Sequence, residues 1–85
     1  MTIFEIWDAT VKAQCDFNTK CAKFCENYKP FNVEVLFVEF PSGELDFYRR
    51  KSEIFYSNGS KDYNIESCKL IKIHDTEYGV FVKLK

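Results

Sequence analysis

The chain has 85 residues, 46% of them hydrophobic and 18% aromatic, and its 12 basic and 13 acidic residues give a formal net charge of −1. A chain of this length holds one hydrophobic core, so we expect a single domain over residues 1–85. The apolar content excludes a disordered chain, and the balanced charge excludes a protein that coats nucleic acid through a general positive field. The longest uninterrupted apolar run covers only residues 35–38, so no membrane partner is expected.

The start of the chain and its cysteines indicate the compartment. Two acidic residues, Glu5 and Asp8, precede the first basic residue, which is the reverse of a secretory signal. We therefore expect a cytoplasmic protein. Three of the four cysteines fall on one predicted helix, where they cannot easily bridge each other, so reduced and buried thiols are expected.

The first segment carries the signals of a long helix. Thr2 and Glu5 have the spacing of a capping box, which predicts a helix from Ile3. Apolar and polar residues then recur every three or four positions to about Tyr28, as in an amphipathic helix with a wide buried face. Pro30 ends it, because proline disfavours helical geometry in the residue before it.

The remaining residues predict strands. Residues 33–40 are rich in β-branched and aromatic side chains, and residues 41–44 form a turn, which predicts a hairpin over residues 33–51. Asn58-Gly59 favours a second hairpin over residues 53–65, and a third is expected over residues 68–84. The expected fold is α+β: one long amphipathic helix packed on one face of a mostly antiparallel sheet of four to six strands, built from consecutive hairpins.

One side of this sheet is expected to remain uncovered. Centring the first turn on Ser42 and Gly43 pairs Val38 with Phe47 on the side that meets the helix. A single helix covers only one side, so the other is predicted to bind a protein partner or a second copy of the chain. The residues predicted there are Val33, Val35, Phe37, Tyr48, Arg50 and Phe81. In the alternative, the sheet curls or residues 52–67 fold back over that side.

Basic residues near the same side suggest an alternative function. Aromatic and basic residues interleaved on a sheet resemble the surfaces that bind single-stranded RNA, where rings stack on bases and cations hold phosphates. The glycine-aromatic consensus of the RNA-recognition fold and its second helix are absent, so the resemblance concerns the surface alone. The residues that would bind RNA are Arg49, Arg50, Lys51, Lys72 and Lys83.

The residues available for catalysis or metal binding are few. His74 is the only histidine, and the least implausible enzyme would be a nuclease that uses it with Arg49 or Arg50. No glycine-rich phosphate loop is present, and we expect no enzyme. Cys21 and Cys25 could join Cys68 and His74 around a metal, but no Cys-x-x-Cys pair is present and the helical pair falls on the expected core face. Neither a metal nor another cofactor is expected.

The composition also carries a resemblance. A compact chain rich in Phe, Tyr, Lys, Asn, Ile and Glu, without a catalytic motif, resembles the small accessory and anti-defence proteins of T-even-type tailed phages. The resemblance implies stoichiometric binding that inhibits a host or defence enzyme, such as a toxin or a nuclease. It assigns no individual residue a role.

Overall fold

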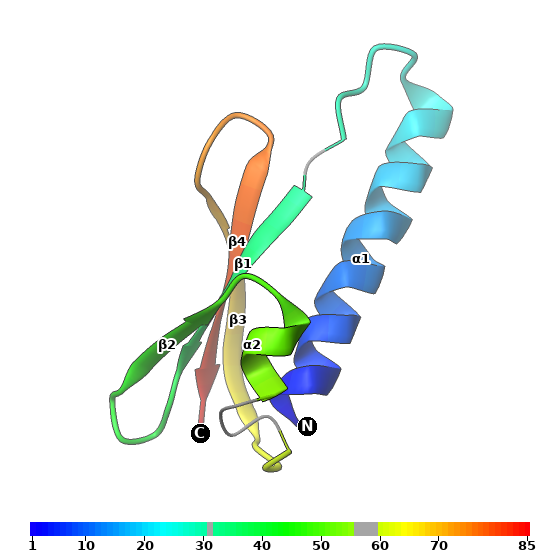
Figure 1. Cartoon of the computed structure of the whole chain (residues 1–85). Coiled ribbons are helices and arrows are strands. Elements are labelled where there is room, and N and C mark those ends of the chain that lie inside the picture. Colours follow the sequence, from blue (N-terminus) through cyan, green and yellow to red (C-terminus); the bar gives the residue numbers. More distant parts are fainter. Residues whose placement is uncertain (31, 56–59) are drawn as a thin grey trace.

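The protein is described from a computed structural model that covers residues 1–30, 32–55 and 60–85 (Figure 1). The expected α+β class and the single long N-terminal helix are confirmed. The described residues form one mixed sheet of four strands rather than six: β1 (Asn32–Glu39), β2 (Leu45–Tyr48), β3 (Ile65–Lys72) and β4 (Glu77–Leu84). Their order across the sheet is β2-β1-β4-β3.

The long helix, α1 (Ile3–Phe24), begins where the capping box predicts it. The Thr2 hydroxyl accepts a hydrogen bond from the Glu5 amide at 3.2 Å, and the Thr2 amide donates to the Glu5 carboxylate at 3.3 Å. The helix ends at Phe24 and not at Tyr28, because Cys25 is extended and its amide makes the last helical bond, to Cys21. Glu26 follows the end of the helix, where the negative end of the helix dipole repels a carboxylate, so a further turn is disfavoured.

The centre of the sheet is a parallel pair that the sequence pattern did not predict. β1 pairs with β2 and β4 with β3 in antiparallel fashion, while β1 and β4 lie side by side and parallel. The pairing joins residues as far apart in the chain as Val33 and Tyr78. The sheet therefore consists of two antiparallel pairs of strands that are neighbours in the sequence, joined by the parallel pairing of β1 with β4.

The turn between β1 and β2 has a different register from the predicted one. The Phe40 amide donates to the Glu44 carbonyl at 2.9 Å, and the Gly43 amide donates to the Phe40 carbonyl at 2.9 Å, so the loop holds three residues and not two. Gly43 has a φ of +89°, the left-handed conformation that such loops require at their last position. Glu39 thus pairs with Leu45, a shift of one residue that exchanges the two sides of β2.

A bulge in β1 moves Val33 to the side of the helix. The register shifts between Val33 and Val35, so Val33 pairs with Tyr78 while Val35 pairs with Gly79. The Val33 amide donates to the Gln14 side-chain oxygen at 2.7 Å, which attaches the start of β1 to the middle of α1. The prediction that Val33 shares the uncovered side is therefore wrong, because strict alternation does not hold through a bulge.

A short helix stands where the first strand of the middle hairpin was predicted. This helix, α2 (Lys51–Phe55), begins after a bend, and its Glu53 carboxylate accepts a hydrogen bond from the Arg49 amide at 2.7 Å. An acidic side chain in the first turn is the arrangement that helix starts favour. The predicted turn at Asn58-Gly59 lies outside the described residues.

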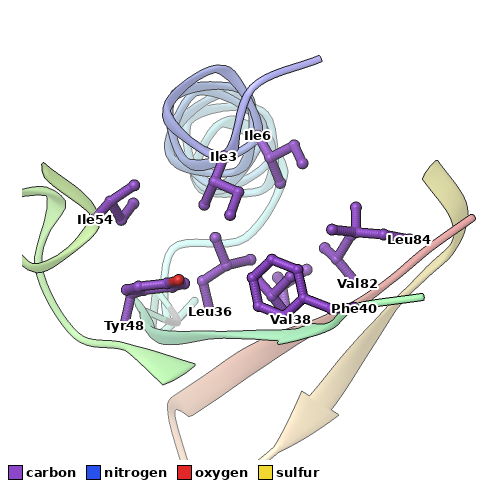
Figure 2. Packing of buried hydrophobic residues seen from close by; sticks show 10 residues of the cluster. Ile3, Ile6, Leu36, Val38, Phe40, Tyr48, Ile54, Val82 and Leu84 are labelled. Atoms are coloured by element: carbon purple, nitrogen blue, oxygen red, sulfur yellow. The ribbon is translucent and has the colours of Figure 1, made fainter. Parts of the chain in front are cut away.

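The core lies between the two helices and one side of the sheet (Figure 2). Ile3 and Ile6 of α1 and Ile54 of α2 point at β1 residues such as Leu36 and Val38, and all five are buried. Only the first two turns of α1 are buried in this way, whereas Phe24 is 83% exposed, so the wide buried helix face that was expected is not formed.

Truncation of two leucines on opposite sides of the sheet tests this layering. Leu36→Ala should lower the free energy of unfolding by about 2–5 kcal/mol, because Leu36 is fully buried and its truncation leaves a cavity. Leu45→Ala should change it by no more than about 0.5 kcal/mol, because the Leu45 side chain is 60% exposed. Urea unfolding of both variants measures the difference. Equal losses would contradict the assignment of the two sides.

Candidate functional site

The candidate site is the side of the sheet that faces away from α1 and α2, called here the open face. Alternation along the strands and the observed registers place the open-face side chains in rows across the sheet. The hydrophobic core of the described residues lies on the other side of the sheet, between the sheet and the two helices. The apolar residues of the open face are Val35, Phe37, Leu45, Phe47, Ile71, Ile73 and Phe81.

An aromatic row crosses the open face. Phe47 of β2 pairs with Phe37 of β1, which in turn pairs with Phe81 of β4. The rings of Phe37 and Phe47 have centroids 6.3 Å apart and are tilted by 42°, within the range of favourable aromatic contacts. Phe37 and Phe81 are partly buried by their neighbours, while Phe47 is 58% exposed. The row is therefore a packed aromatic surface that still exposes apolar area.

Gly79 allows two of the open-face side chains to lie close to the sheet. A methyl group on its Cα would lie 3.1 Å from Phe37 Cε2 and 3.2 Å from Ile73 Cδ1. Both distances are tighter than ordinary van der Waals contact, so the two side chains occupy the space that any other residue would need. Glycine at this position thus allows the Phe37 and Ile73 side chains to pack directly on the β4 backbone.

Charged residues surround the aromatic row. The Arg49 guanidinium lies 5.9 Å from the centre of the Phe47 ring, within cation–π range, and Lys69 pairs with Phe81 at the opposite end of the row. Beside the row, Lys83 Nζ lies 3.4 Å from the Glu66 carboxylate and 3.8 Å from that of Glu39. The open face thus has an apolar centre and a charged border.

The structure brings together three of the six residues predicted on the uncovered side, with Val33 excluded by the bulge in β1. Val35, Phe37 and Phe81 share the open face, with Val35 buried beneath its neighbours. Tyr48 does not: it is 4% exposed and lies in the core, because the shift in the turn register turns it toward the helices. Arg50 lies in the bend between β2 and α2, beyond the paired part of the sheet.

Two open-face residues were missed for the same reason. Phe47 and Leu45 were placed on the helix side by centring the turn on Ser42 and Gly43, and both are exposed on the open face. A local signal was present: proline followed two residues later by glycine is typical of a three-residue loop with a left-handed last residue. Counting the loop in this way gives the observed register.

The residues predicted to bind RNA are not gathered on one surface. Arg49 and Lys83 belong to the open face, but Lys51 lies on α2, where its amine is 3.0 Å from both Asp8 carboxylate oxygens. Lys72 pairs with Tyr78 and alternates with Ile71, which places it on the side of the helices. The prediction that Lys72 lies near the same side as Phe81 is therefore wrong, because β3 pairs with β4 in a register that places Ile71 and not Lys72 on that side.

The described residues of the segment 52–67, which was predicted as a possible cover of the open face, do not cover it. Ile54 of α2 and Tyr63 both pack with the core on the helix side, and the Tyr63 ring meets that of Phe40 edge-on at 5.6 Å. The amide of Tyr63 donates to the Met1 carbonyl at 2.8 Å, which fastens this segment to the start of α1. These contacts hold Ile54 and Tyr63 on the helix side, while residues 65–67 are part of β3 and so belong to the sheet and do not cover it.

In the described part of the chain, no group of three or more Cys, His, Asp or Glu side chains gathers as metal ligands would, and His74 is exposed in the loop after β3. Neither described helix is long and apolar enough to cross a bilayer. Comparison of the chain with protein-family models, with curated proteins and with solved structures found no match.

Adding a methyl group at Gly79 tests the packing of the open face. Gly79→Ala should lower the free energy of unfolding by about 1–3 kcal/mol, because the new methyl overlaps Phe37 and Ile73. Combining it with Ile73→Val, which removes Cδ1, should recover part of that loss. Urea unfolding of the single and double variants provides the measurement. If Gly79→Ala unfolds at the same urea concentration as the original protein, Phe37 is not fixed as described.

Proposed function

We propose that the protein acts without catalysis, by binding another protein stoichiometrically through the open face. One observation carries the proposal: Phe47 and Leu45 stand 58% and 60% exposed beside the aromatic row. Soluble monomers seldom expose a contiguous apolar surface of this kind unless a partner covers it. Aromatic side chains held rigid by neighbouring strands also lose little entropy on binding, which suits them as anchors.

The charges at the two ends of the aromatic row favour a different protein over a second copy of this chain. Arg49 lies at one end and Lys69 at the other, and neither forms an ion pair with another described residue. A two-fold axis that stacks the aromatic row on its own copy, either parallel or perpendicular to the row, brings cations together: Arg49 with Arg49 and Lys69 with Lys69, or Arg49 with Lys69. A partner with an apolar centre and an acidic border avoids this repulsion.

The resemblance to accessory proteins of T-even-type phages suggests the class of partner. Such a partner would be a host or defence enzyme, such as a toxin or a nuclease, that the protein inhibits by occupying a functional surface. A domain of this size can cover about 800 Å² of a partner, the area of a standard interface. Inhibition then requires only binding, which fits a chain whose open face carries apolar anchors.

A charge placed in the aromatic row tests the proposed surface. Phe47→Glu should weaken partner binding roughly 30-fold, because the loss of a central aromatic anchor costs about 2 kcal/mol or more. Its free energy of unfolding should change by no more than about 0.5 kcal/mol, since the side chain is largely exposed. The measurement is affinity capture from extracts of the cells in which the protein occurs, with quantitative mass spectrometry of what each variant retains.

The matched control is Val11→Glu, which introduces the same charge at an exposed apolar residue of α1. A protein retained in equal amounts by the original chain and by Val11→Glu but lost with Phe47→Glu is the expected partner. A protein that all three retain alike would show that the open face does not bind it.

The mass of the purified protein in solution distinguishes the other possible occupants of the open face, which are a second copy of the chain and RNA. Light scattering at low and high salt, with absorbance at 260 and 280 nm, should show a monomer free of nucleic acid. A salt-resistant dimer that Phe47→Glu dissociates would place a second copy on the open face. A monomer that carries nucleic acid at low salt and releases it at high salt would favour RNA binding in place of the proposal.

A further inference from the structure

The outer edge of β3 carries backbone groups that no described residue pairs with. β3 is the last strand in the order β2-β1-β4-β3, so it is paired only on its side toward β4. The Ile73 amide donates to the Glu77 carbonyl at 2.9 Å, so the backbone of Ile73 points toward β4. Backbone groups of successive residues point alternately to the two sides of a strand. The amides and carbonyls of Cys68, Leu70 and Lys72 therefore point outward.

This edge is regular enough to accept another strand. The register of β3 with β4 is constant from Ser67 to Lys72, and it shifts only between Ile65 and Ser67. Among the described residues, none of the backbone hydrogen bonds formed outside the helices and strands involves residues 68–72. A straight row of unpaired donors and acceptors is a template for an extended chain, whose own backbone groups it would satisfy. The opposite edge strand, β2, has only four residues in all.

The side chains of this segment define what an added strand would meet. Lys69 lies on the open-face side of β3, whereas Leu70 and Lys72 lie on the helix side. Leu70 is 52% exposed, and both lysines are exposed. Neither lysine forms an ion pair with another described residue. An added strand would therefore have one cation beside it on each side of the sheet.

The charges of the segment favour a foreign strand over a second copy of the chain. Residues 68–72 include two lysines and no acidic residue. Two copies joined edge to edge through this segment would bring the lysines of both into one short ladder without a carboxylate between them. Lysines on an edge strand discourage pairing between copies for this reason. A strand with carboxylates opposite Lys69 and Lys72 would instead be attracted at both positions.

The spacing of these residues sets the sequence pattern of the added strand. Residues directly opposite each other share a side of the sheet, and antiparallel pairing is the more stable arrangement per residue. An antiparallel strand therefore meets Lys72 first, Leu70 two residues later and Lys69 one residue after that. The matching order is an acidic residue, any residue, an apolar residue and a second acidic residue.

We propose that the outer edge of β3, from Cys68 to Lys72, is the docking site for an extended acidic segment of a partner protein, which joins the sheet as an additional antiparallel strand. Its backbone pairs with Cys68, Leu70 and Lys72, its carboxylates face Lys69 and Lys72, and its apolar residue covers Leu70. The proposal does not rest on binding through the open face, so either surface can fail its test alone.

Hydrogen exchange in the protein alone tests the free edge. The amides of Leu70 and Lys72 should exchange at least about tenfold faster than those of Lys69 and Ile71, because only the latter two bond to β4 and require opening of the ladder. Exchange measured amide by amide with NMR provides the comparison. Equal protection of all four amides would show that the edge is already covered and would overturn the proposal.

Designed peptides are the probes for the added strand. The first is a dye-labelled peptide of about ten residues, long enough to span the segment, that carries the acidic and apolar residues in the order given above. In the second, lysines replace the two acidic residues. The third and fourth are the acidic peptide with a single backbone N-methyl group, placed opposite Leu70, where the amide faces β3, or opposite Ile71, where it points away. Fluorescence anisotropy with the full-length protein gives each Kd.

The acidic peptide should bind at least about tenfold more tightly than the basic one. The N-methyl group opposite Leu70 should weaken binding by at least about tenfold, whereas the one opposite Ile71 should change the Kd by no more than about twofold. Contacts through side chains or charge alone would not distinguish the two methylated peptides. Equal Kd values for these two peptides would overturn the proposal.

Protein variants locate the bound peptide. Lys72→Glu should weaken binding of the acidic peptide by at least about tenfold and strengthen binding of the basic one. The matched control is Lys12→Glu, which makes the same change of charge at an exposed residue of α1. Equal weakening by both variants would show that only net charge matters, and loss of binding with Phe47→Glu would place the peptide on the open face. Either result would overturn the proposal.

Discussion

The parallel pairing of β1 with β4 is the constraint on which the rest of the molecule depends. Without it the chain holds two separate antiparallel strand pairs, neither with enough apolar area to retain a helix. The pairing aligns Leu36 with Val80 and Val38 with Val82, which form the floor under Ile3 and Ile6. The same register aligns Phe37 with Phe81 on the other side of the sheet. One set of backbone hydrogen bonds therefore determines both the core and the open face.

The covering of this sheet is incomplete on both sides, for two different reasons. The open face is uncovered because both described helices lie on the core side. On the core side α1 covers only part of the sheet, because Ile3 and Ile6 attach its first turns to the core and Gln14 attaches its middle to Val33. These attachments hold α1 over one half of the sheet.

Local chemistry was the part of the structure that could be predicted. The Thr2–Glu5 capping box located the start of α1, and the glycine at residue 43 located a turn, because both signals act between residues a few positions apart. The side of the sheet that each residue occupies was harder to predict. A difference of one residue in the length of the loop exchanges the sides of Phe47 and Tyr48. The Pro41–Gly43 spacing is the local signal that favours the three-residue loop and with it the observed sides.

The remaining differences arise from contacts that leave no local trace. No local sequence signal around Val33 predicts its pairing with Tyr78. The bulge that turns Val33 toward Gln14 exists only when α1 and β4 are both in place. Likewise, residues 53–55 have a composition acceptable in a strand and became helical because Ile54 enters the core there. In these places tertiary packing overrides local preference.

The order of the strands also bears on how the protein avoids self-association into fibres. Its two edge strands are those with the least capacity to template further β-pairing: β2 has four residues, and β3 carries Lys69 and Lys72 and an irregularity between Ile65 and Ser67. The apolar strands β1 and β4, whose bare edges would recruit other chains, are enclosed between them. The fold can thus expose an aromatic face while its sheet edges resist amyloid-like growth.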